Sequence, residues 1–365
     1  MKKVLKSITQ TSAHFSKSTR FLIGLSLFCF LLVYTISFSD LLGTQYSRAD
    51  EIVGELKTLT NKVMPVKLDT VAYDQKMLAL ANYASTTATT TVRAWPVKAP
   101  YPLPGALLPE KRIIAYYGNF YSTKMGVLGE YPTDVVKQKL RAEMARWDAA
   151  DPTTKTIPAI DYIAITAQGS PGKDGMYRFR MPDSEIDKAV ALAKEVNGIV
   201  ILDIQVGLSN MRTEVPLLEK YLQMPEVHLA LDPEFSMKNG AKPGSVIGSL
   251  DASEINYVTS YLAGLVTTHN LPPKVLVIHR FTGPMVTNTS LIQTRPEVQI
   301  VMDMDGWGDP AKKKNTYFRT VFSYPVQFTG FKIFYKNDLK PPSTRLLTPE
   351  ELLKLTPQPS FIQYQ

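Results

Sequence analysis

The stretch IVILDIQVGLSNMRTEVPLLEKYLQMPEVHLALDPE, residues 199–234, decides the fold class. The runs 199–202 and 227–231 have the length and apolar composition of buried strands. Side chains two positions apart leave a strand on the same face. A polar pair with this spacing follows each run, namely Asp203 with Gln205 and Asp232 with Glu234.

The same pattern occurs a third time, where Asp303 and Asp305 follow the run 298–302. Three such pairs on successive parallel strands would place a cluster of carboxylates at one rim of a sheet or barrel. Like charges in a partly buried site repel and shift one another's pKa, which is costly unless function requires it. The cluster therefore favours an enzyme.

Outward from these strands, the chain alternates strand and helix from residue 111 to residue 365. The strand candidates are residues 113–118, 162–167, 199–205, 227–232, 275–280, 298–303, 331–335 and 361–364. The helix candidates are residues 133–147, 184–196, 252–268 and 349–355, and the last two begin with capping boxes. Eight strands interleaved with helices match a (β/α)8 TIM-type barrel, usually about 250 residues long. A doubly wound open α/β sheet is the alternative.

The N-terminal segment predicts attachment to a membrane. Residues 1–20 contain five Lys or Arg and no acidic residue, and residues 21–39 follow without a charge. This length suits a membrane span of roughly 17–25 residues, and the basic flank predicts that residues 1–20 form a cytoplasmic tail. We interpret residues 21–42 as a transmembrane signal-anchor, with the C-terminal domain outside the cytoplasm. A signal peptide cleaved near residues 37–39 is the alternative.

Residues 43–110 are interpreted as a stalk or linker before the barrel domain, residues 111–365. Helical spacing of apolar residues occurs at 48–63, and a short helix is expected at 74–83. A Thr-rich run and a Pro-rich stretch follow, which suit an extended linker. A strap across the bottom of the domain remains the alternative.

Charge and cysteine content exclude two classes of protein. The chain has 41 Lys and Arg against 33 Asp and Glu, but five of the basic residues lie in residues 1–20, which leaves 36 against 33. This excess is too mild to predict nucleic-acid binding. The single cysteine, Cys29, lies in the apolar segment. The outer part therefore has neither a disulfide nor a thiol nucleophile.

The strand-end carboxylates supply the candidate catalytic residues. In a (β/α)8 barrel the site forms at the carboxyl ends of the strands, and glycoside hydrolysis needs two carboxyl groups flanking the scissile bond. We assign Glu234 as the acid, because partial desolvation beside Phe235 would raise its pKa. Asp232 would orient Glu234 or keep it protonated. Asp303 or Asp305 would be the opposing carboxylate.

Amides, carboxylates and aromatic rings dominate the other strand ends, and no cationic phosphate clamp is found among them. This is the chemistry of a carbohydrate site. The candidate substrate-binding residues are Asp203, Gln205, Tyr116, Tyr117, Gln168, His279, Trp307 and Tyr335. Structural roles remain open: an aspartate at a strand end often caps the next helix, His279 suits a core position, and Trp307 suits packing under a loop.

The Leu-Asp-Pro-Glu sequence at the end of the fourth strand, residues 231–234, resembles the last part of the Asp-x-Asp-x-Glu motif of family 18 chitinase-like barrels. The resemblance implies that Glu234 is the acid and that Asp232 assists an acetamido group of the substrate. The match departs two positions before Asp232, where this chain has Ala230 instead of the motif's Asp, and two positions before that stands His228. The whole chain resembles uncharacterised exported bacterial envelope proteins with a glycoside-hydrolase-like barrel.

The leading hypothesis is a membrane-anchored glycoside hydrolase that acts on a cell-envelope or extracellular glycan by carboxylate acid/base catalysis. The alternative is a non-catalytic glycan-binding or envelope-organising barrel. A metal-dependent hydrolase is disfavoured because the four histidines lack ligand spacing. No phosphate-cradling loop is present either, so we expect no cofactor and no metal.

Overall fold

The computed structural model describes residues 68–83 and 93–365. The expected cytoplasmic tail, the signal-anchor at 21–42 and the first part of the stalk lie outside the described residues. Among the helices of the described ranges, none combines the length and the apolarity that a bilayer span requires.

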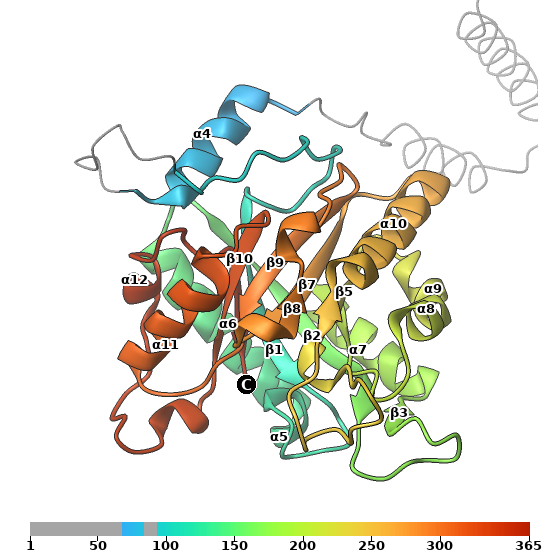
Figure 1. Ribbon diagram of the computed structural model, residues 1–365. Helices are drawn as coiled ribbons and strands as arrows, with labels where there is room; N and C mark the ends of the chain where they lie inside the picture. Colours follow the sequence, from blue (N-terminus) through green and yellow to red (C-terminus); the bar gives the residue numbers. More distant parts are fainter. Residues whose placement is uncertain (1–67, 84–92) are drawn as a thin grey trace, which may run out of the picture. The chain divides into compact units, whose positions relative to one another are not determined.

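The core of the structure is a closed barrel of eight parallel strands (Figure 1). The strands are β1 (Lys111–Gly118), β2 (Lys155–Ala167), β4 (Ile199–Ile204), β5 (Val227–Leu231), β7 (Lys274–Arg280), β9 (Val298–Met304), β10 (Phe328–Ile333) and β11 (Phe361–Tyr364). Closure is achieved by β1, which pairs with β2 on one side and with β11 on the other. The (β/α)8 prediction is thus confirmed, and the open sheet is excluded.

Helices surround the barrel and short elements occupy its loops. The helices are α4 (Thr70–Ala81), α5 (Val127–Glu130), α6 (Thr133–Ala150), α7 (Asp183–Glu195), α8 (Met211–Glu214), α9 (Glu219–Leu222), α10 (Ala252–His269), α11 (Pro310–Tyr317) and α12 (Pro349–Leu352). Single 3-10 turns are η3 (Val215–Leu218), η4 (Pro233–Phe235), η5 (Gly283–Met285), η6 (Thr289–Leu291) and η8 (Asn337–Leu339), and α11 continues into a π-helical turn, η7 (Phe318–Phe322). The short strands are β3 (Arg178–Arg180), β6 (Leu250–Asp251) and β8 (Val286–Thr287).

Both predicted capping boxes are present. The Asp251 carboxylate accepts from the backbone N–H of Ser253 at 2.9 Å, and Glu254 accepts from the backbone N–H of Asp251 at 3.0 Å. Thr348 and Glu351 form the same reciprocal arrangement at the start of α12. These contacts satisfy backbone donors that the first turn of a helix leaves without partners. The start of each of these two helices is therefore set by residues only three positions apart in the sequence.

Residues alternate along each strand between an outer and an inner layer. In β1, Ile114 and Tyr116 pack outward with helix residues such as Trp147, whereas Ile113 and Ala115 pack inside the barrel. The inner layer is apolar near the strand starts, because Ile113 and Ala115 meet small and branched residues of the other strands there. Farther along the strands the inner layer becomes polar, and that change positions the site.

Helix α4 and residues 93–110 form a strap across the end of the barrel where the strands begin (Figure 1). Tyr73, Met77 and Leu80 pack into the inner apolar layer. The Gln299 side chain accepts from the backbone N–H groups of residues 107 and 108, at 3.0 Å each. Of the two alternatives that the sequence leaves open, this part adopts the strap, so the packed unit includes residues before the expected boundary at 111.

The strap also contacts the C-terminal end of the chain. The backbone N–H of Gln358 donates to the carbonyl oxygen of Leu80 at 2.8 Å. The Asn82 side chain donates to the carbonyl oxygens of Leu353 and Leu355, at 3.1 and 2.8 Å. Helix α4 is therefore fixed to the connection that leads into β11, the strand that closes the barrel.

Two strand boundaries differ from the prediction and change which residues face inward. Strand β2 begins at Lys155 rather than at residue 162, so Asp161 lies inside a strand. Strand β10 covers Phe328–Ile333 rather than 331–335, so Tyr335 follows the strand instead of ending it, while Lys332 lies in the strand as in the prediction. Tertiary pairing extends β2 through Pro158, a residue type that weakens a local strand signal.

Candidate active site

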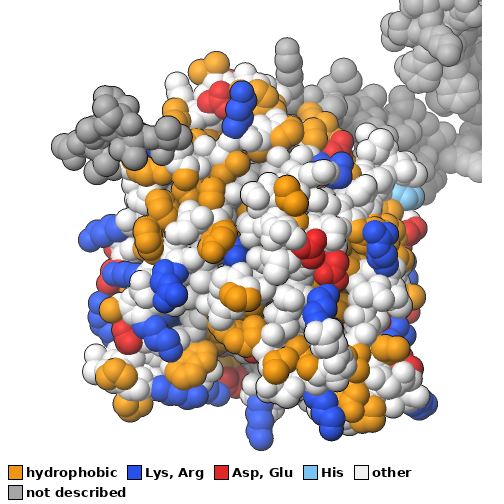
Figure 2. All heavy atoms as spheres, viewed as in Figure 1, with side chains coloured by type: hydrophobic (Ala, Val, Ile, Leu, Met, Phe, Trp, Pro, Cys, Tyr) orange, Lys and Arg blue, Asp and Glu red, His pale blue; other side chains and the backbone are white. Residues whose placement is uncertain are grey.

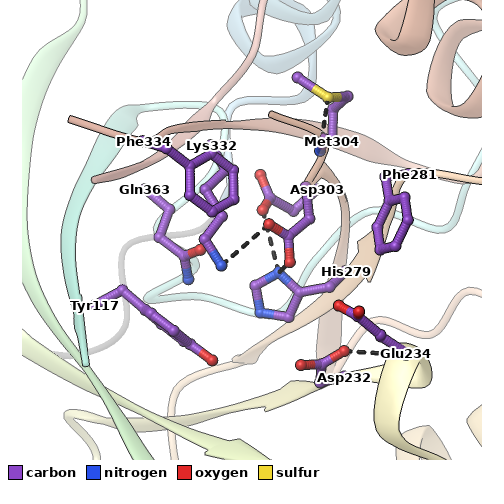
Figure 3. Close-up of polar contacts among 12 residues, drawn as sticks. Tyr117, Asp232, Glu234, His279, Phe281, Asp303, Met304, Lys332, Phe334 and Gln363 are labelled. Carbon is purple, nitrogen blue, oxygen red and sulfur yellow. Dashed lines mark hydrogen bonds and ion pairs between the residues drawn. The ribbon is translucent and has the colours of Figure 1, made fainter. Parts of the chain in front are cut away.

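A cavity of about 490 Å³ lies at the carboxyl ends of the barrel strands. Its polar lining includes side chains from five strands or the loops just after them: Tyr117, Gln205, Asp232, Glu234, Asp305 and Lys332. Aromatic rings complete the wall, namely Phe235, Phe281, Trp307 and Phe334. Figure 3 shows Tyr117, Lys332 and Gln363 facing Asp232, Glu234 and His279 from opposite sides. The sequence-predicted residues Glu234, Asp232, Asp305, Gln205, Tyr117 and Trp307 are thus brought together.

Asp232 positions Glu234 at the end of β5. One carboxylate oxygen of Asp232 accepts from the backbone N–H of Glu234 at 3.0 Å and caps the single turn η4. The other oxygen accepts from the Gln205 side-chain amide at 3.1 Å. The same amide nitrogen lies 3.3 Å from the Tyr117 hydroxyl. Asp232 therefore has the helix-capping role that the sequence left open, and this role holds Glu234 at the cavity wall.

Both carboxyl groups of this pair favour the protonated form. Burial raises the pKa of Glu234, and the nearby carboxylate of Asp305 raises it further. Burial also raises the pKa of Asp232 well above its ordinary range, with Asp203 adding to the shift. A carboxyl group that keeps its proton near neutral pH can act as a general acid.

Asp305 contacts two cationic side chains. One of its oxygens lies 3.1 Å from the Lys332 ammonium, and the other lies 3.3 Å from Nδ1 of His279. Lys332 is buried and its ammonium lies 4.0 Å from the centre of the Tyr117 ring. Burial lowers the pKa of Lys332, but Asp305 and the other nearby carboxylates outweigh this effect and raise it. Asp305 therefore has a cationic partner on each of its two oxygens.

His279 lies beneath the cavity and joins three strands. Its Nε2 is 2.8 Å from Asp203, and its Nδ1 is 3.3 Å from Asp303, with all three residues fully buried. Burial disfavours the charged ring, but the hydrogen bond to Asp203 and the nearby carboxylates of Asp303 and Asp305 outweigh it and raise the pKa of His279 well above its ordinary value. His279 is thus a charged core residue, and the core position left open by the sequence is the one observed.

Several predicted residues do not reach the cavity. Asp303 was expected as a possible opposing carboxylate, and Asp203 and His279 as binding residues, but they lie one layer deeper than Asp305 and Gln205. The reason is geometric: residues two positions apart share a face of the strand but differ in depth by about 6.6 Å along the barrel, from roughly 3.3 Å per residue. Asp305 is the accessible member of its pair.

Tyr116, Tyr335 and Gln168 also lie away from the cavity. Tyr116 is on the outer face of β1, because a shift of one residue reverses the face, and its hydroxyl lies 3.1 Å from that of Tyr335. Tyr335 also donates to Glu143 of α6 at 2.9 Å. The Gln168 side chain is directed to the backbone carbonyl of Arg178 at 3.5 Å. The first two therefore stabilise the contact between the sheet and α6.

Sequence reasoning missed Lys332 and Asp161 as site residues. The expected boundary of the second strand excluded Asp161, and Lys332 was not recognised as inward-facing. In the structure, Asp161 accepts from the Gln363 side chain at 2.5 Å beneath the cavity, and burial raises its pKa. In both cases the sequence signal was a single charged residue inside an otherwise apolar strand, which could have indicated a buried site residue.

The polar layer beneath the cavity is not fully satisfied. Buried oxygens without a hydrogen-bond partner occur on Asp161, Asp203, Asp303 and Gln363. Burying such groups costs free energy, so this layer lowers the stability of the folded state. Gly330 of β10 makes room for it, because a Cβ at that position would lie 2.5 Å from an Asp303 oxygen. Within residues 68–83 and 93–365, no set of three His, Cys, Asp or Glu side chains is arranged to hold a metal ion.

Comparison with known proteins assigns no family to the chain. No protein-family model matches the chain, and no curated protein matches it. Among solved structures, the chain is similar to a ruminal GH26 endo-β-1,4-mannanase with a TM-score of 0.33 and 10% sequence identity. The similar region covers 70% of this chain and 59% of the mannanase chain. We draw no functional argument from a likeness at this level.

Proposed function

We propose that the protein is a glycoside hydrolase whose acid is Glu234 and whose opposing carboxylate is Asp305. One observation carries this proposal: two carboxyl groups line one cavity in contrasting environments. Burial raises the pKa of Glu234, whereas Asp305 makes direct contacts with the Lys332 ammonium at 3.1 Å and with Nδ1 of His279 at 3.3 Å. Two carboxyl groups with divergent environments are the requirement for hydrolysis of a glycosidic bond.

In the proposed reaction, Glu234 donates its proton to the glycosidic oxygen as the bond to the anomeric carbon breaks. Asp305 either attacks the anomeric carbon or removes a proton from the water that attacks it. In the first case the resulting ester is hydrolysed by water, from which the Glu234 carboxylate takes a proton. Glu234 then ends protonated. In the second case Asp305 ends protonated and Glu234 ionised, and proton exchange with solvent restores the starting state; in both cases the net change is addition of one water across the bond.

The remaining cavity residues suit a sugar ring. Phe281 and Phe334 present apolar surface to the cavity, while Gln205 and Tyr117 present polar groups. Sugars combine apolar ring faces with hydroxyl groups, and sites of mixed aromatic and amide character bind them. Asp232 and Gln205 act as positioning residues for Glu234, through the hydrogen bonds described above.

We further propose that the domain acts outside the cytoplasm, held by residues 21–42. The uncharged run after a basic leader supports this placement. In cells that produce the full chain, a membrane-impermeant protease added outside, after permeabilising any outer envelope layer, should digest the barrel domain. The protein should also sediment with membranes. A barrel domain that remains protected until the inner membrane is lysed would contradict the placement.

Asp305→Asn tests the proposed function directly. We expect the wild-type full chain to release reducing ends from at least one polysaccharide of an envelope-glycan panel, and the variant to lose about 10²-fold in rate or more. Asp134→Asn is the matched control, because Asp134 is exposed on α6 and does not line the cavity. Analysis of the product anomer would assign retention or inversion.

The result that favours the alternative is specific. If the wild-type chain binds a glycan of the panel but releases no product, the protein is a glycan-binding barrel rather than a hydrolase. Unchanged turnover by the Asp305→Asn variant would remove Asp305 from the reaction.

A further inference from the structure

We propose that the glycan is acidic and that a pair of lysines at Trp307 recognises an anionic substituent on the sugar next to the cleaved one. This inference rests on the proposed function, since it names the substrate class of the same cavity. Trp307 follows β9 at the cavity wall and is 47% exposed. The ammonium groups of Lys312 and Lys340 lie 4.8 and 4.9 Å from its ring centre.

The indole ring holds both ammonium groups at the mouth of the cavity. Attraction between a cation and an aromatic face restrains flexible lysine side chains, so two positive charges are presented within a fixed region. The arrangement changes the expected role of Trp307: its ring positions cations rather than serving only as a surface for sugar stacking.

The backbone around Trp307 is built to accept this arrangement. Gly308 has a φ of +146°, and a Cβ there would lie 2.7 Å from Cδ of Lys312. The backbone N–H of Gly308 donates to Asp338 at 3.0 Å, and Asp338 pairs with Lys313 at 2.7 Å. Asp338 therefore holds the loop in place. A side chain larger than glycine at position 308 would collide with the side chain of Lys312.

The charges at this mouth are not neutralised by neighbouring carboxylates. Across residues 68–83 and 93–365, no carboxylate lies within 4.0 Å of Lys312, Lys340 or the cavity-lining Lys124. Lys332 and Lys336 differ, because they pair with Asp305 and Glu130. In the side view of Figure 2, Lys and Arg side chains gather in the region of α11, the helix that carries Lys312. Clustered charge of one sign attracts ligands of the opposite sign.

The acidic interior limits where the anionic substituent can lie. Asp232, Glu234 and Asp305 surround the reacting position. An anion there would lie against the Asp305 carboxylate and would oppose ionisation of the other two carboxyl groups. The substituent therefore belongs at the mouth, on a neighbouring sugar. A second recess of about 240 Å³ shares Lys124, Phe334 and Gln365 with the cavity, so the surface continues for further sugars of a chain.

The test measures binding of hexuronate trisaccharides in several configurations, each paired with its carboxyl-reduced, neutral counterpart. Binding is measured with the full-length Glu234→Gln chain, so that the probe is not consumed. We expect at least one uronate to bind about tenfold more tightly than its neutral counterpart, with affinity falling as salt is added. A sulfated trisaccharide in the same series separates a need for carboxylate from a need for any anion.

Adding Lys312→Gln and Lys340→Gln to the Glu234→Gln chain should abolish its preference for the uronate over the neutral trisaccharide. Binding of the neutral sugar should be unchanged. Lys111→Gln is the control, because Lys111 is exposed at the start of β1, at the opposite end of the barrel. Equal binding of acidic and neutral sugars, or a preference that survives the double substitution, overturns the inference and leaves the proposed function standing. Failure to bind either form of any pair counts against both.

Discussion

Glu234→Gln is expected to lower glycan hydrolysis by about 10²- to 10⁴-fold, the usual contribution of a general acid. Glutamine has the shape of glutamate but cannot donate the proton that the leaving sugar oxygen requires. The Asp232 contact that places this residue is made to its backbone N–H, so the substitution leaves the contact intact. Folding should therefore be unchanged, as judged by circular dichroism and denaturant unfolding.

The leaving group distinguishes loss of the acid from general damage. An aryl glycoside with an acidic leaving group needs little protonation, so the Glu234→Gln chain should retain much more of its rate on that substrate. The wild-type rate should fall on the alkaline side as Glu234 loses its proton, above the ordinary glutamate pKa of about 4.3, because burial raises the pKa. The rate of the Glu234→Gln chain should not show this fall at alkaline pH.

Glu110→Gln is the matched control, since Glu110 is exposed just before β1 at the opposite end of the barrel. It should behave as wild type on both substrates. Full activity of the Glu234→Gln chain on an unactivated glycan would reject Glu234 as the acid.

His279→Leu is expected to reduce the free energy of unfolding by about 3–5 kcal/mol at pH 8, the usual cost of breaking a buried ion pair. The substitution removes the cation that Asp203 and Asp303 contact, and both carboxyl groups are fully buried. They would have to stay charged without a partner or take up protons, and both outcomes are unfavourable at this pH.

The cost should be smaller at pH 5. Titration of His279 opposes this trend, because its folded pKa is raised: its contribution is complete below the unfolded value of about 6.5 and is lost as the pH rises through the folded pKa. The two buried carboxyl groups outweigh this single group. The folded pKa of Asp303 is also raised, mainly by burial, so the folded state favours its protonated form and loses stability as pH rises above about 3.9. In the variant, acid protonates the buried carboxyl groups and relieves their repulsion.

Chemical denaturation of the wild-type chain and the variant at pH 5 and pH 8 measures this difference. His269→Leu is the control, because His269 is exposed at the end of α10 and should change stability little at either pH. An equal loss at both pH values would mean that the His279 effect comes from packing rather than from charge.

Local sequence signals predicted the parts of this fold that depend on neighbouring residues. The capping boxes at Asp251 and Thr348 were found because both partners lie within three positions. The polar pairs at the strand ends were found because a strand alternates faces with a period of two. The (β/α)8 barrel followed from the number and spacing of the runs.

Features that depend on distant residues were not predicted. The alternation rule gives the face of Asp303 and Asp305 but not their depth, which is set by the stagger of neighbouring strands. The position of Lys332 beside Asp305 depends on the register of β10 against β9, which no local pattern reveals. Tyr116 is different: placing Tyr117 inside already requires Tyr116 outside, so this assignment could have been corrected from the sequence.

The contact between the strap and the last connection constrains the order of events during protein synthesis. Asn82 and its partner Leu353 are 271 positions apart, so helix α4 leaves the ribosome long before its partner is made. The barrel surface against which α4 packs is incomplete until β11 pairs with β1 and β10. Helix α4 can therefore make its full set of contacts only after β11 has joined the barrel. Protection of Met77 and Leu80 from limited proteolysis would mark closure of the barrel.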